Sequence, residues 1–144
     1  MTKPVAVVPA TQDIDLFNDF ATDDKADDGV WVEYRGGVEF LIAYTKNRKF
    51  KNRASYFYKK NSKMLEAGGE VAADKLTEIT IQVMAETVLL DWRGPMKLQG
   101  EVLTYNVTNA KRLLALEGFR EWVSKQSEDL ANFKAVQEAE DLGN

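Results

Sequence analysis

The order of hydrophobic and polar residues predicts a domain in which short strands precede longer helices. Residues 30–44, VWVEYRGGVEFLIAY, hold two runs rich in β-branched and aromatic side chains, which are typical of strands. An Arg-Gly-Gly sequence separates the runs, and glycine adopts the positive φ of a tight turn without strain. We therefore predict a β-hairpin with strands over 30–34 and 38–44. It should rest against helices, because an isolated hairpin is only marginally stable.

Two helical patterns follow the hairpin. Over residues 46–65, apolar side chains recur at helical spacing, and Gly68-Gly69 ends the pattern. Over residues 71–90 the apolar arc is wider, which predicts a helix buried on more than one side. The run ITIQV within it has β character, so a strand is the alternative, and the length of the pattern favours the helix.

The stretch after residue 90 predicts a turn-rich connection and a short helix. Gly94-Pro95 stops the preceding helix, and residues 96–105 are expected to form a small hairpin or an ordered loop that turns near Gln99-Gly100. A helix over 107–117 should follow. Its N-cap is predicted to be Asn106, and Thr108, two residues later, is the alternative.

A final helix is predicted from Phe119 to about Gln137, with a stripe of large apolar residues along one side. The whole pattern indicates an α+β fold that is mainly α. In it, an N-terminal β-hairpin packs on about four helices, and a short second hairpin or loop lies near 93–105.

The two ends of the chain differ from the middle in charge. Residues 1–29 hold seven Asp and two Lys, a local charge of −5. Acidic, weakly apolar segments bury too little surface to offset the entropy of ordering. We predict a mobile acidic arm over 1–29, a single globular domain over 30–137 and an acidic tail over 138–144. Within the arm, the segment DIDLFNDF could form an amphipathic turn that docks on a partner or on its own domain.

Composition argues against enzyme chemistry. Cysteine and histidine are absent, which excludes thiolate nucleophiles and Cys-based metal sites and removes the commonest general base near neutral pH. Carboxylate chemistry stays open, but no acidic pair stands out by spacing. We expect no enzyme activity, no cofactor and no metal site. We also expect no membrane span, since no apolar run approaches ~18 residues, and a cytosolic location, since no signal peptide pattern is present.

One segment suggests a binding surface. From Lys46 to Lys63 there are eight Lys or Arg and no acid, interleaved with aromatic residues. Such a segment could bind RNA or single-stranded DNA through phosphate contacts and stacking, or an acidic protein surface. The alternative is a purely structural role, in which the aromatic residues pack in the core and the lysines face solvent. The overall charge of −4 argues against a dedicated nucleic-acid binder.

Residues 91–133 carry a more specific pattern. It reads D-W-x-G, then G-x-x-L-x-Y-x-x-x-N-A-x-x-L-L, then F-R-x-x-V-x-x-x-S-x-D-x-x-N-F. This order resembles the C-terminal part of tail assembly chaperones of long-tailed bacteriophages. The residues that carry the resemblance are Asp91, Trp92, Gly94, Gly100, Leu103, Tyr105, Asn109, Ala110, Leu113, Leu114, Phe119, Arg120, Val123, Ser127, Asp129, Asn132 and Phe133.

The resemblance implies a small, mainly helical protein of the host cytoplasm that leaves before the mature virion forms. Such proteins bind the long, mostly helical tape measure protein, keep it soluble and recruit tail tube subunits. They also tend to self-associate. In many phages a longer form arises by ribosomal frameshifting, which would make this chain the short form.

Candidate protein-contact residues are the aromatics that a holdase would expose and two cations of the basic segment: Trp31, Phe40, Lys49, Arg53, Tyr56, Tyr58 and Trp122. For each aromatic the alternative is packing in the core. Two other functions stay open. A structural tail or neck protein of the virion is one, although a tube subunit needs more strands than the roughly four counted. A nucleic-acid-binding regulator that uses residues 46–63 is the other.

Overall fold

The computed structural model describes residues 13–23 and 25–134. In chain order its elements are α1 (Leu16–Phe20), α2 (Lys25–Asp28), β1 (Val30–Arg35), β2 (Val38–Ile42), α3 (Arg48–Lys60), α4 (Ser62–Ala67), α5 (Gly69–Thr87), β3 (Leu89–Arg93), β4 (Lys97–Leu98), β5 (Glu101–Val102), α6 (Val107–Leu114), α7 (Glu117–Glu128) and a 3₁₀ turn, η1 (Leu130–Asn132). The predicted class, α+β and mainly α, is confirmed, and so are the N-terminal hairpin and the small second hairpin.

The main sheet has three antiparallel strands in the order β1-β2-β3. Val32 pairs with Phe40 and Phe40 with Trp92, so these three side chains lie on one face. Trp31, Leu41 and Asp91 form the neighbouring row and lie on the opposite face. The sequence pattern did not predict β3. Residues 89 and 90 were expected to end a helix, but α5 ends at Thr87 and the chain then turns to pair with β2.

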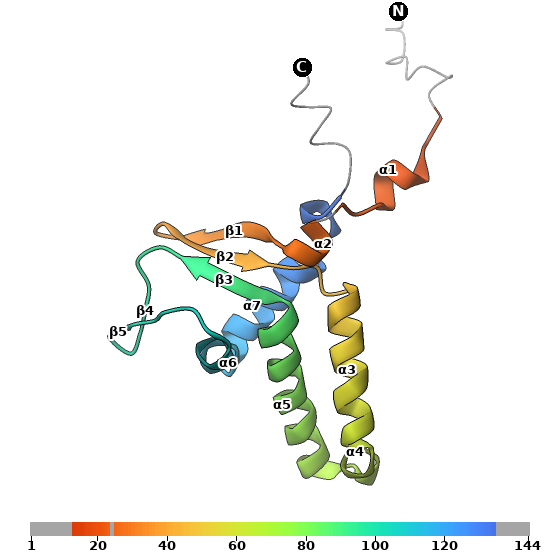
Figure 1. The fold of residues 1–144 in the computed structure, drawn as a ribbon, viewed down its shortest axis with the longest axis vertical. Helices are drawn as coiled ribbons and strands as arrows, with labels where there is room; N and C mark the ends of the chain where they lie inside the picture. The colour runs from red at the N-terminus through yellow and green to blue at the C-terminus, as the bar shows by residue number, and fades with distance from the viewer. Residues whose placement is uncertain (1–12, 24, 135–144) are drawn as a thin grey trace, which may run out of the picture.

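The core forms where the Phe40 face of the sheet meets the helices. Phe40 and Ile42 of β2 pack with the last turns of α5 and with residues of α6 and α7. Leu114 and Val123 are fully buried there, one on each of the two last helices. Figure 1 shows the sheet on one side of α6 and α7, with the C-terminal end of α5 leading directly into β3.

Helices α3, α4 and α5 form an arm that projects from this core (Figure 1). Asn47 caps α3: its Oδ1 accepts from the Phe50 amide at 2.8 Å, and its Nδ2 donates to the carbonyl of Thr87 at 3.3 Å. A second cluster, formed by Ala54, Ile79 and Val83, joins α3 to α5. The cap and the cluster together hold the two helices side by side.

Three helix boundaries differ from the predicted ones. The basic helix predicted over 46–65 breaks at Asn61, whose side-chain Nδ2 donates to the carbonyl of Phe57 at 2.8 Å. The helix predicted over 107–117 is α6 and ends at Leu114. The helix predicted from Phe119 to about Gln137 is α7 and ends at Glu128, because Asp129 has an extended backbone and caps η1.

Part of the segment predicted as an acidic arm contacts the domain. The amide of Asp23 donates to the carbonyl of Phe133 at 3.0 Å, and Thr22 forms an isolated antiparallel bridge with Lys134. We call these contacts the N-terminal anchor. The amide of Tyr44 also donates to the carbonyl of Ala26 at 2.9 Å. Residues 1–12 of the predicted arm and the predicted tail over 138–144 lie outside the described residues.

Candidate protein-binding surfaces

The seven candidate contact residues divide among three places in the fold. Phe40 and Trp122 lie on the covered side of the sheet. Trp31 lies on the open side. Lys49, Arg53, Tyr56 and Tyr58 lie on α3. The sequence therefore pointed to residues that do not form one site.

Phe40 and Trp122 belong to an aromatic cluster. The ring centroids of these two residues are 5.7 Å apart, and Phe40 also packs on Phe119 at 5.1 Å and on Trp92 at 6.3 Å. Phe40 is only 3% exposed, so its expected exposure to a partner was wrong. The alternating pattern of β2 puts this residue on the face that α6 and α7 cover.

Trp31 is half-buried on the open face of the sheet. The guanidinium of Arg93 stacks over its ring at 3.9 Å from the centroid, and Arg93 Nε lies 2.9 Å from Glu39 Oε1. A cation over an indole face is favourable, most of all where water is excluded. This local cluster gives Trp31 a structural partner within the chain.

One flank of α3 carries three of the candidates, together with Lys60. Lys49, Arg53, Tyr56 and Lys60 recur at spacings of four, three and four, so they share one side of the helix. The Arg53 guanidinium lies 5.1 Å from the Tyr56 ring centroid, and Lys60 Nζ lies 5.8 Å from the same centroid. Tyr58 falls two residues after Tyr56 and therefore points to the other flank.

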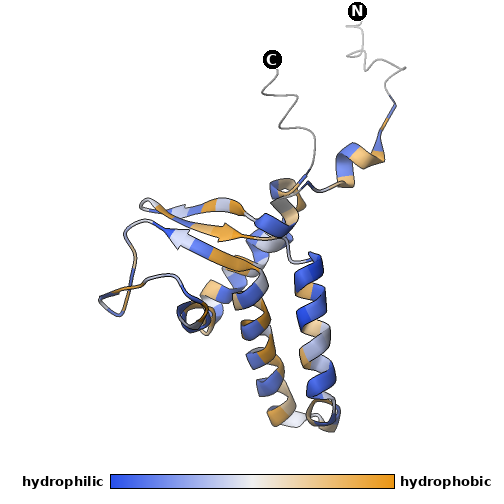
Figure 2. Cartoon of the chain, viewed as in Figure 1, coloured by the Kyte–Doolittle hydropathy of each residue, from blue (hydrophilic) through white to orange (hydrophobic). Residues whose placement is uncertain are grey.

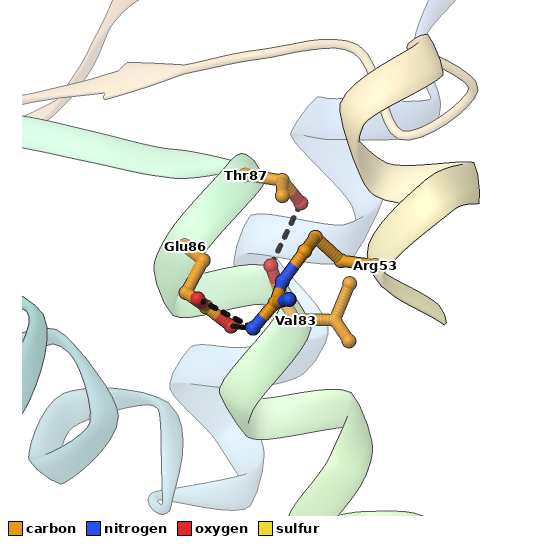
Figure 3. A network of polar contacts seen from close by, with 4 residues as sticks. All are labelled: Arg53, Val83, Glu86 and Thr87. Carbon is orange, nitrogen blue, oxygen red and sulfur yellow. Dashed lines mark hydrogen bonds and ion pairs between the residues drawn. The ribbon is translucent and has the colours of Figure 1, made fainter. Parts of the chain in front are cut away.

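Arg53 joins this flank to α5. Its Nη2 lies 3.0 Å and 3.3 Å from the two carboxylate oxygens of Glu86 (Figure 3). Its Nε is buried and has no hydrogen-bond partner among the residues that the structure describes. In the same view the Thr87 hydroxyl donates to the carbonyl of Val83 at 2.7 Å. Arg53 therefore links α3 to α5 in addition to contributing a positive charge to the surface.

The start of α3 borders a hollow of mixed charge. Its volume is about 700 Å³, and its basic lining comes from Lys46, Arg48, Lys49 and Lys51. Asp23 and Asp27 line the same hollow, so both cations and carboxylates contribute to its lining. A phosphate backbone would meet the two carboxylates as well as the lysines, which disfavours nucleic acid at this place.

The end of the arm farthest from the sheet exposes apolar side chains. Met64 of α4 and Val71 and Leu76 of α5 are between 43% and 66% exposed. We call these three residues the arm tip. Figure 2 shows that α3 is mostly hydrophilic, while α5 carries hydrophobic residues down to the end next to α4. The helical patterns over 46–65 and 71–90 include Met64 and Leu76 among their apolar positions but do not single out Val71. Helical spacing marks an apolar side of each helix and does not show how far along the helix the core extends.

The comparisons with known proteins concern the arm and the last helices. The model of the YdaY prophage protein family matches residues 45–144, which is more than half of the chain. The chain belongs to this family. The phage origin that the resemblance implied is therefore confirmed. No curated protein and no solved structure matches the chain.

The matched range of this YdaY family chain includes the whole arm, from α3 to α5, together with β3, α6 and α7. Across residues 13–23 and 25–134, no helix is long and apolar enough to cross a membrane. In the same part of the chain, no group of three or more acidic side chains is placed to hold a metal ion.

Proposed function

We propose that this phage protein is a tail assembly chaperone. It binds the tape measure protein, keeps it soluble and helps to recruit tail tube subunits. It acts without catalysis in the host cytoplasm and is absent from the mature virion. The family match supports the phage origin of the chain, and the resemblance of residues 91–133 supports this class of phage protein.

The observation that carries the proposal is the apolar arm tip. Met64, Val71 and Leu76 are exposed at the end of a helical pair that projects from the core. Fully burying an aliphatic side chain of this size stabilises a complex by about 1.5–3 kcal/mol, so covering even the exposed parts favours binding. Met64 adds an unbranched, adaptable side chain, which suits a surface that meets many similar segments.

A helical partner fits this surface best. An amphipathic helix presents apolar side chains at intervals of three and four residues, and it binds by placing them against a complementary apolar surface between helices. Lys59 and Lys60 at the end of α3 and Lys63 of α4 lie near the same end of the arm. They would pair with acidic residues on the polar side of such a helix.

Co-expression with the tape measure protein tests the proposal. The wild-type chain should raise the soluble fraction of that protein and elute with it from a sizing column. The triple variant Met64→Ser, Val71→Ser, Leu76→Ser should lose both effects and keep its fold, because the three side chains are exposed. Val102→Ser is the matched control, since Val102 is an exposed valine on β5, outside the arm.

Two results would contradict the proposal. In the first, the wild-type chain leaves the solubility and elution of the tape measure protein unchanged. In the second, the triple variant performs as well as wild type, which would exclude the arm tip as the contact surface. Abundant copies of the chain in purified virions, measured by mass spectrometry, would favour a structural tail protein instead.

A further inference from the structure

Helix α1 has an apolar side with no covering in the structure. Ile14, Leu16, Phe17 and Phe20 are between 64% and 80% exposed, and no residue of α1 is buried. Figure 1 shows α1 standing apart from the sheet and the other helices. A five-residue helix is far below the ~12–15 residues at which isolated helices become marginally stable, so α1 needs a surface to pack on.

The charge of α1 indicates which kind of surface it fits. Residues 13–23 hold four Asp and no Lys or Arg. Asp15 is used as the N-cap, and its Oδ1 accepts from the amide of Phe17 at 3.0 Å. The segment is therefore an acidic helix with two exposed phenyl rings. Its complement is an apolar groove with cations on the rim.

The groove between α5 and α6 has those properties. It has a volume of about 430 Å³ and is lined by Glu78, Ile81, Thr108, Lys111, Arg112 and Ala115. Ile81 and Ala115, with the methylene stems of Lys111 and Arg112, supply an apolar floor. The one acid, Glu78, already has a cation beside it, since Lys75 Nζ lies 3.5 Å from its carboxylate. The charges of Lys111 and Arg112 remain for a ligand.

We propose that α1 of one copy docks in the α5–α6 groove of a second copy. The apolar side chains of α1 would cover the groove, and Asp13 and Asp19 would face Lys111 and Arg112. The proposal uses surfaces other than the arm tip and does not depend on the proposed function.

The N-terminal anchor explains why the groove belongs to another copy. Phe20 is two residues from Thr22 and so stays within roughly 7 Å of the anchor. The anchor lies beside the last turn of α7, where Asn132 Nδ2 donates to the carbonyl of Gln126 at 3.2 Å. Ala115 precedes the first turn of the same helix. At 1.5 Å per residue, the nine steps along α7 from Glu117 to Gln126 span about 14 Å, and Ala115 lies before Glu117. Phe20 therefore does not reach the groove of its own chain while the anchor holds.

Each copy presents one α1 and one groove, so two copies can exchange helices reciprocally, or more copies can associate head to tail. A helix this short buries little surface, and the association should be weak and dependent on concentration. Sedimentation velocity of the full chain over a concentration series measures it. Wild type should shift from monomer towards dimer or larger species as the concentration rises.

Two variants that disrupt opposite halves of the contact provide the decisive test. Phe17→Ser with Phe20→Ser removes the ligand side, and Lys111→Glu with Arg112→Glu removes the receptor side. The variant of Phe17 and Phe20 should weaken association by about tenfold or more, because burial of one phenyl ring already accounts for that factor. The variant of Lys111 and Arg112 should also weaken it, because it places carboxylates opposite Asp13 and Asp19. An equimolar mixture should recover a heterodimer, because one variant keeps its groove and the other keeps its helix. Val102→Ser should associate like wild type.

Circular dichroism and thermal unfolding check that both variants fold, which is expected since the substituted side chains of α1 are exposed. A wild-type chain that stays monomeric at every concentration would overturn the proposal. So would variants that associate like wild type, or a mixture that stays as monomeric as its components.

Discussion

The guanidinium of Arg53 on α3 lies 3.0 Å from the carboxylate of Glu86 on α5. This pair bridges the two long helices of the arm at a point next to the Val83 cluster. The Arg53 guanidinium also lies 4.8 Å from the Phe57 ring centroid, so the same cation packs on an aromatic residue of its own helix. Arg53 thus connects the polar flank of α3 to the packing between α3 and α5.

A double-mutant cycle should show that the ion pair itself is weak. Arg53→Met, Glu86→Gln and the double variant are compared by urea unfolding. Both side chains are partly exposed, so we expect a coupling energy of about 0.5–1 kcal/mol that falls as salt is added. Arg93 and Glu39 provide a second, more exposed pair as a control. A coupling energy that does not respond to salt would contradict this account.

Trp92 should contribute to stability through its indole N–H. The Nε1 of this buried residue donates to the carbonyl of Leu103 at 2.8 Å and so ties β3 to the chain after β5. Trp92→Phe keeps an aromatic ring but leaves that carbonyl without its donor. We expect a loss of about 1–3 kcal/mol in the free energy of unfolding. Trp31→Phe, on the open face of the sheet, should cost less. Equal losses for the two variants would show that the hydrogen bond is unimportant.

Tyr105 should make stability fall at alkaline pH. Burial raises the pKa of Tyr105 above its ordinary value of 10.0, and the nearby charge of Asp91 raises it further. A raised pKa in the folded state means that folding favours the neutral phenol. This stabilisation is fully present below about pH 10 and is lost as the pH rises through the raised pKa.

The variant Tyr105→Phe should therefore reduce the fall in stability above about pH 10. It should also cost about 1 kcal/mol at neutral pH, because the Tyr105 hydroxyl donates to the carbonyl of Leu89 at 2.9 Å. Thermal unfolding as a function of pH measures both effects. Tyr58→Phe, at an exposed tyrosine, is the control. A pH profile unchanged by Tyr105→Phe would rule out this role.

Gly94 is required by close packing of the backbone. It has φ +105°, and a Cβ at this position would lie 2.9 Å from the Cα of Val38. Gly94→Ala should destabilise the protein through both backbone strain and this overlap, by about 2–4 kcal/mol. Gly100 also has positive φ, +84°, but a Cβ there meets nothing within 4 Å. Gly100→Ala should therefore cost only about 1 kcal/mol by chemical unfolding. A larger loss at Gly100 than at Gly94 would refute the steric argument.

The periodicity of apolar residues predicted most of the helices and strands, because an element can pack on the core only if its apolar residues recur on one side. The hairpin at 30–44, the helix starting after Asn106 and the turn at Gln99-Gly100 all agree with the structure. β3 was missed because Leu89 and Leu90 continue the helical spacing of α5. Residues 89–93 form a strand because they pair with the edge of β2, and this pairing cannot be seen in the local sequence. The ends of α3 and α7 were missed because single side chains, Asn61 and Asp129, compete for backbone groups.

The candidate contact residues were harder to predict. Phe40 and Tyr56 are both large aromatics in amphipathic segments, yet Phe40 is buried under α6 and α7 while Tyr56 lies on an exposed flank. Exposure depends on which faces meet after folding, and one segment does not contain that information. The apolar residues of α1 were visible in the sequence, but their lack of covering was not.

The sequence by itself determined the class of fold, the places of most helices and strands, the absence of histidine and cysteine chemistry, and the resemblance over 91–133 to a class of phage proteins. These follow from local propensity, spacing and composition. The tertiary structure decided what local patterns cannot. It added β3 to the sheet, separated the candidate residues among three surfaces and left α1 and the arm tip uncovered. It did so because burial depends on contacts between segments that are distant in the chain.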